Sequence, residues 1–188
     1  MLIMTRTMLT GRRAAAGALG IALALALIAA TVLPSLAQTA PPPIGVELLT
    51  ARAQFTDTVD AQFRVKLDGG ATNVLNMPDA SRTRTARFTV QPGAQFPWHT
   101  HPGPVMVNVV QGTLVYVQAI DCIERAYPAG TAFIDPGRGN VHTAFNPDAA
   151  TPTVFIATIF DLPADGALSD TNVVPRDCDI QVGTHAGH

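Results

Sequence analysis

The residues after position 37 predict an all-β fold, either a β-sandwich or a β-barrel. Apolar and polar residues alternate there over short runs, which is the period of a half-buried strand. The 15 glycines and 15 prolines are spread at intervals and divide the chain into many short elements. No stretch after residue 37 repeats its apolar residues at the spacing of an amphipathic helix. A series of short strands explains all three observations.

The first predicted strand covers residues 62–67, where Phe63, Val65 and Leu67 alternate with polar residues up to Gly69-Gly70. Further strands are predicted at 83–90, 105–110, 113–120, 130–135, 141–145 and 153–160. Turn signals separate them, including Gln91-Pro92-Gly93, Gln111-Gly112, Pro136-Gly137-Arg138-Gly139 and Asn146-Pro147-Asp148. After Leu162 the chain becomes polar and irregular, so no further strand is expected.

The first 37 residues have the layout of a secretory signal peptide. Arg12 and Arg13 close a positively charged start, and residues 14–33 are an uncharged run rich in Ala and Leu. Ser35 and Ala37 are small residues at the positions that a signal peptidase reads. We therefore expect cleavage after Ala37 and export to the periplasm or the cell exterior. The alternative is an uncleaved membrane anchor, because about 20 apolar residues can just span a bilayer. The paired arginines leave the twin-arginine route open beside the general one.

The chain is expected to divide into four parts. They are a signal peptide at 1–37, a Pro-rich linker at 38–45, a β domain at 46–163 and an irregular C-terminal tail at 164–188. Residues 38–188 hold 9 basic and 14 acidic side chains, a net charge of 9 − 14 = −5. An acidic domain argues against a nucleic-acid partner, whose phosphates require a cationic face.

The two cysteines, Cys122 and Cys178, both lie in the part expected to be exported. An even pair in an oxidising compartment predicts a disulfide. Cys178 follows Arg176 and Asp177 in a polar stretch, so a bridge would tether the tail to the β domain. The alternative is one buried and one exposed free thiol.

The five histidines are the best candidates for chemistry. His99 and His101 are two residues apart, so in an extended strand both side chains project from one face and can converge on a metal. His142 lies on another predicted strand. His185 and His188 lie in a Gly-rich end, where we expect no preorganised site.

The spacing of residues around these histidines resembles the two motifs of the cupin superfamily. The first motif is Gly93, five residues, His99-Thr100-His101 and then Gly112. The second is Gly130, five residues, Pro136, Gly139, two residues, His142, three residues and Asn146. Together they cover about residues 83–161. The resemblance implies a double-stranded β-helix, which is a small jelly-roll barrel, with His99, His101 and His142 as ligands of a metal at its mouth.

The sequence departs from the cupin pattern at two places. Val105 stands where the first motif usually has a Glu ligand, and the second motif has one extra residue between Pro136 and Gly139. Three neutral imidazoles would leave the charge of the metal uncompensated, as in some cupin dioxygenases that lack the Glu. Imidazole ligands suit Fe, Cu, Zn or Ni, and three protein ligands leave positions open for other molecules. Metal affinity is expected to fall with pH near about 6.5, where imidazole is protonated.

The expected pocket residues are Val105, Tyr116 and Phe145, beside the three histidines. The first hypothesis is a dioxygenase-type oxidation of a small organic molecule, with hydrolysis or isomerisation at zinc as a second reaction class. The rival hypothesis is a non-catalytic cupin that binds or senses a small ligand, with a structural metal or none. No general base is evident in the motifs, so the sequence leaves the enzyme status open. Cupins often pair through their outer strands, which makes a homodimer a candidate assembly.

Overall fold

The computed structural model describes residues 43–80, 82–164, 166–175, 178 and 180. The expected signal peptide, most of the expected linker, and His185 and His188 lie outside the described residues. The described residues form eleven strands and no helix, which confirms the all-β class. Among them, no helix is long and apolar enough to cross a membrane.

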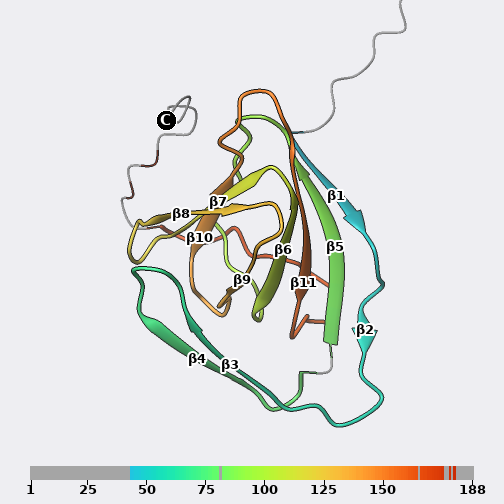
Figure 1. Ribbon diagram of the computed structural model, residues 1–188. Coiled ribbons are helices and arrows are strands. Elements are labelled where there is room, and N and C mark those ends of the chain that lie inside the picture. Colours follow the sequence, from blue (N-terminus) through green and yellow to red (C-terminus); the bar gives the residue numbers. More distant parts are fainter. Residues whose placement is uncertain (1–42, 81, 165, 176–177, 179, 181–188) are drawn as a thin grey trace, which may run out of the picture. The chain divides into compact units, whose positions relative to one another are not determined.

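The larger sheet has six strands, all antiparallel to their neighbours (Figure 1). Its order is β1–β5–β11–β6–β9, and β2 pairs with the beginning of β5. The strands are β1 (Ile44–Leu48), β2 (Ala53–Gln54), β5 (Arg82–Val90), β6 (Val105–Gln111), β9 (Ala132–Asp135) and β11 (Thr153–Ile159). Neighbours in the sheet are distant in sequence, as expected of a jelly roll.

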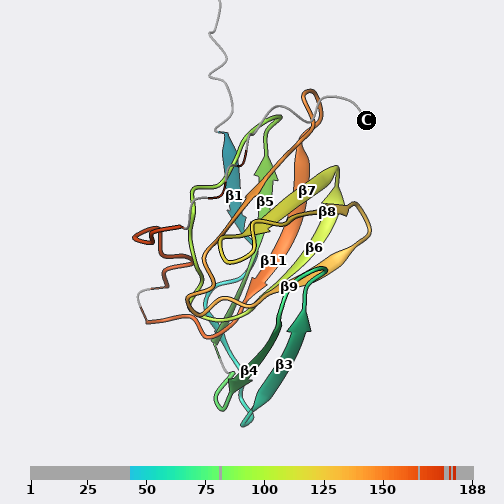
Figure 2. The same cartoon turned by 90° about the vertical axis from the view of Figure 1, so that its left-hand side faces the viewer.

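The smaller sheet has the order β10–β7–β8. Its strands are β7 (Thr113–Gln118), β8 (Glu124–Pro128) and β10 (His142–Phe145). On its other side, β10 pairs with the segment before β6 through two isolated antiparallel bridges, Gln95 with Phe145 and His99 with His142. A separate hairpin of β3 (Ala61–Lys66) and β4 (Thr72–Met77) precedes β5 and lies beyond the ends of the two sheets (Figure 2).

The core lies between the inward faces of the two sheets. Along β6, Val105, Val107 and Val109 are buried while Met106 is exposed, which is the period-2 burial of a strand with one wet face. The smaller sheet contributes Leu114 and Tyr116 to the same hydrophobic cluster. A second, smaller cluster forms on the other face of β7 and β10 from Val115, Val117 and Phe145.

Four strands were not predicted from the sequence, and each has a weak pattern. β1 begins at Ile44, inside the segment expected to be linker, and β2 has only two residues. β4 carries Val74 and Leu75 in succession, so its residues do not alternate. β8 holds charged residues and a proline. Sheet pairing, rather than patterning within the strand, defines these elements.

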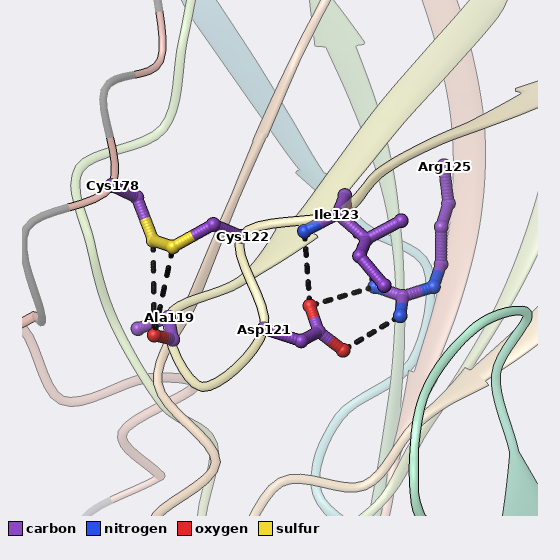
Figure 3. The surroundings of a disulfide bond; sticks show 6 residues. All are labelled: Ala119, Asp121, Cys122, Ile123, Arg125 and Cys178. Atoms are coloured by element: carbon purple, nitrogen blue, oxygen red, sulfur yellow. Dashed lines mark hydrogen bonds and ion pairs between the residues drawn. A yellow bond between two sulfur atoms is a disulfide. The ribbon is translucent and has the colours of Figure 1, made fainter.

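The C-terminal tail is attached to the β domain at two points. Thr100 and Asp170 exchange two backbone hydrogen bonds of 2.9–3.0 Å. Cys122 and Cys178 form a disulfide with their Cα atoms 5.5 Å apart (Figure 3). Both sulfur atoms lie within 3.9 Å of the Ala119 carbonyl oxygen, as contacts rather than hydrogen bonds because a disulfide carries no S–H. The tail is therefore a fixed neighbour of the loop before β6.

Candidate metal centre

The three predicted histidines converge because of a short antiparallel pairing. His99 and His142 exchange two backbone hydrogen bonds, each 2.9 Å long. His101 follows on the same face as His99, two residues along. One possible ligand nitrogen from each of the three side chains lies within 4.8 Å of the other two. The two motifs are thus brought together into one site.

Glycines allow the two motif loops to approach closely. Gly137 has φ of 58°, and a side chain there would collide with the Gly103 carbonyl. The next amide, of Arg138, donates to the His101 carbonyl at 2.8 Å. The turn between β9 and β10 therefore fixes the backbone at His101.

Each of the three imidazoles has its Nδ1 atom beside a backbone carbonyl. The distances are 2.8 Å from His99 to Pro97 O, 2.7 Å from His101 to Leu168 O and 3.1 Å from His142 to Asn140 O. A carbonyl oxygen only accepts, so Nδ1 carries the proton in each ring. Each Nε2 then keeps its lone pair, and this outer hydrogen bond is the usual partner of a metal-bound histidine.

Burial favours the neutral form of His99 and His101. Burial, followed by the nearby imidazoles of His142 and His101, lowers the pKa of His99 from 6.5 to about 3. Burial also lowers the pKa of His101, although the Asp135 carboxylate beside it acts in the opposite direction. Neutral imidazole is the form that binds metal. The donor set therefore fits a divalent transition metal, and protonation of His99 and His101 should compete with that metal only below the pH of about 6.5 expected from the sequence.

Asp135 is a member of this site that the sequence analysis missed. Its side chain is buried, and Oδ1 accepts hydrogen bonds from Tyr116 OH at 2.8 Å and from the Gly137 amide at 3.2 Å. Oδ2 has no hydrogen-bond partner among the described residues, and it lies 3.7 Å from His101 Nε2. Burial, with Asp135 nearby, raises the pKa of Tyr116 well above 10.0, so the phenol stays a donor.

A cavity of about 230 Å³ opens beside the histidines between the two sheets. Its described lining is mostly aliphatic and aromatic and includes no Lys or Arg. Val105 and Tyr116 are among the residues that line it. Phe145 does not line it, which corrects the sequence-based expectation. His142 and Ala144 point into the cavity, so alternation along β10 turns Phe145 into the second hydrophobic cluster.

The tail forms one wall of the cavity, which the sequence analysis also missed. Leu168, Ser169 and Thr171 line it. The Leu168 carbonyl is the partner of His101, 67 residues away in sequence. No local pattern in a polar, irregular segment signals this contact.

Comparison with known proteins identifies the domain. Residues 86–159 match the family model described as the cupin domain. No curated protein matches the chain.

Solved structures also resemble the chain. The polyketide cyclase RemF from Streptomyces resistomycificus is 20% identical, with 42% of this chain and 54% of that chain covered and a TM-score of 0.38. A cupin-like protein from Thermotoga maritima is 22% identical, with 47% of this chain and 62% of that chain covered and a TM-score of 0.41. A protein with a double-stranded β-helix domain from Klebsiella pneumoniae is 25% identical, with 47% of this chain and 75% of that chain covered and a TM-score of 0.38. The chain thus spans about half of the RemF chain.

The matched residues 86–159 contain both histidine motifs and strands from both sheets. Their antiparallel jelly-roll arrangement is the double-stranded β-helix that the motif spacing implied. Residues 86–159 therefore form a domain of the cupin family.

Proposed function

We propose that this protein binds one divalent transition metal through Nε2 of His99, His101 and His142. The observation that carries the proposal is the set of three Nδ1 to carbonyl contacts, which leaves three bare Nε2 atoms in one site. Fe, Cu, Zn and Ni all accept imidazole ligands. The protein would orient the three imidazoles and surround the site with apolar side chains, and the metal would supply Lewis-acid or redox chemistry.

We propose that the ligand of this centre is a small, uncharged and largely apolar organic molecule. The described lining offers aromatic and aliphatic side chains but no Lys or Arg to pair with a carboxylate or phosphate. Asp135 would repel such an anion further. An engineered apolar cavity of about 150 Å³ holds benzene, so a volume of about 230 Å³ suits a somewhat larger molecule.

Oxidation of this molecule with dioxygen is the reaction class that we propose. Three protein ligands leave coordination positions open, and the apolar cavity adjoins them. Tyr116 and Asp135 are two of the polar groups that line the cavity, and they can orient a hydroxyl group of the ligand. A non-catalytic cupin that only binds such a ligand is the alternative, and oxygen consumption with added ligand distinguishes the two.

We also propose that the protein is exported. The disulfide between Cys122 and Cys178 supports this location, because such bonds persist in oxidising compartments. The mass of the mature protein tests the proposal, which predicts a chain that begins at Gln38.

Elemental analysis and calorimetric titration test the metal proposal. The purified protein should take up one equivalent of metal, and His99→Ala, His101→Ala and His142→Ala should each abolish stoichiometric binding. His185→Ala and His188→Ala are matched controls that should leave binding unchanged. A protein that binds no metal, or that binds metal only through the two control histidines, would overturn the proposal.

A further inference from the structure

The three histidine ligands of the proposed metal site are neutral. Strand β6 adds no negative charge to them, because it carries Val105 where the cupin motif usually has a glutamate. Val105 is buried, lines the cavity and occupies the place of the usual glutamate. In the sheet, Val105 is paired directly with Asp135 of β9. Residues directly opposite each other in an antiparallel pair share one face, with Cβ atoms about 4.5–5.5 Å apart. A carboxylate from β9 therefore enters the space where a carboxylate from β6 would stand.

The Asp135 carboxylate is held in one orientation. Tyr116 OH and the Gly137 amide both donate to Oδ1, and the Tyr116 ring packs against His142 with centroids 5.0 Å apart. Because both donors act on Oδ1, the rotation of the carboxyl group is fixed. Oδ2 is thereby directed toward the side of the cavity where His101 Nε2 lies, 3.7 Å away.

The environment of Asp135 lacks a cation among the described residues that line the cavity. The side chain is 2% exposed, and its Oδ2 is one of two buried side-chain atoms without a described partner. Burying a carboxylate without a counter-charge is costly unless it pairs with a cation or binds a metal. His101 Nε2, 3.7 Å from Oδ2, is an acceptor that does not stabilise a carboxylate, and His142 faces Oδ1 through Nδ1 at 3.6 Å, which is beyond hydrogen-bond distance.

We propose that Asp135 is the anionic member of the metal site, replacing from β9 the glutamate that β6 lacks. This inference rests on the metal binding proposed above. It explains how the domain can keep a divalent ion after the motif glutamate has been replaced by valine. Tyr116 is a positioning residue that holds the carboxylate through Oδ1.

Zinc titration of the full mature chain tests this inference. Asp135→Asn keeps the shape of the side chain and removes the charge. Its Zn²⁺ affinity should fall by at least about tenfold, the lower end of the loss seen when an outer partner of a metal site is removed. Asp57→Asn, the same change at an exposed position outside the cavity, is the matched control and should bind like wild type.

A second substitution moves the carboxylate back to β6. Val105→Glu combined with Asp135→Asn should recover most of the affinity lost in Asp135→Asn. Val105→Glu alone should not tighten zinc binding, because Asp135 already supplies the charge and a second carboxylate beside it repels the first. If Asp135→Asn does not fold, as seen by circular dichroism, Val105→Glu alone decides. Tightening by about tenfold or more would show that the wild-type site lacks an anion and would overturn the inference.

The outcomes separate the two proposals. A wild-type protein that binds no zinc contradicts the proposed metal site itself. A wild-type protein that binds zinc, with Asp135→Asn equal to it within about twofold, contradicts only the role of Asp135. Loss of affinity in Asp135→Asn with recovery in the double variant supports both.

Discussion

The barrel and the tail orient the histidines in different ways. His99 and His142 are oriented by carbonyls two residues away, at Pro97 and Asn140. His101 is oriented by the Leu168 carbonyl, 67 residues away in the tail. Two of the three ligands are thus fixed by the strands and loops that carry them, whereas the third depends on a segment without secondary structure. A short-range pattern can encode the first arrangement but not the second.

Removing the tail tests this difference most severely. Deletion of residues 164–188 takes away the partner of His101 and one wall of the cavity. Zinc affinity should fall by about 10- to 100-fold, the loss typical of a missing outer partner. The deletion should carry Cys122→Ala, so that a free thiol cannot bind the metal. Calorimetry measures the change, and full-length His101→Ala shows how a site with two histidines behaves. Affinity within about threefold of wild type would mean that the loop alone orients His101.

Removing the disulfide between Cys122 and Cys178 weakens the attachment of the tail without removing the tail itself. The two cysteines are 56 residues apart, for which the loop-entropy model gives about 4 kcal/mol as an upper figure. Cys122→Ala with Cys178→Ala should therefore lower the free energy of unfolding by up to that amount in urea titrations. Zinc affinity should change less than in the deletion, because the Thr100–Asp170 pairing still holds Leu168 in place. Equal unfolding curves for wild type and the double variant under oxidising conditions would contradict this role.

Acid should act on the locally oriented part of the site. The pKa of His99 is about 3 when folded and 6.5 in the unfolded chain, so the unfolded chain binds the extra proton first. Stability is therefore complete above about pH 6.5 and is lost as the pH falls toward 3. Between pH 7 and pH 5 this group alone should remove about 2 kcal/mol from the metal-free protein. Urea unfolding of wild type and His99→Asn at both pH values measures the difference, and an equal loss in both proteins would assign it to other groups.

The sequence predicted the histidine cluster because its motif spacing reflects a local geometry. His99 and His142 meet through one antiparallel bridge, and His101 follows on the same face. Alternation also contained the answer for Phe145, which is an odd number of residues from His142 and so faces the other side.

Asp135 and the tail wall required information that one strand or segment does not hold. An aspartate before Pro136-Gly137 is typical of a turn, and its inward direction follows from the pairing of β9 with β6. The contact from Leu168 to His101 joins residues far apart in an irregular segment. The first depends on the order of strands in the sheet, and the second depends on where the tail packs against the domain. The apolar periodicity of a single segment predicts neither.

The smallest expected effects concern two arginines that fasten the chain after β11. Arg52 donates through Nε and Nη2 to the Leu162 carbonyl at 3.1 and 2.9 Å, whereas Arg84 donates through Nη1 alone to the Gly166 carbonyl at 3.1 Å. Nε of Arg84 is buried without a described partner, so replacing this side chain also relieves an unmet donor. Arg52→Met should therefore cost about 1–2 kcal/mol of unfolding free energy and Arg84→Met about 1 kcal/mol or less. Urea titration compares the two.

Both arginine variants should leave zinc affinity within about threefold of wild type, since the two backbone hydrogen bonds between Thr100 and Asp170 still hold the chain two residues after Leu168. A larger loss of affinity in Arg84→Met than in Arg52→Met would place the critical anchor of the tail at Gly166. The orientation of His101 would then depend on the entry of the tail into the site, and the strand-like bridge at Asp170 would be secondary.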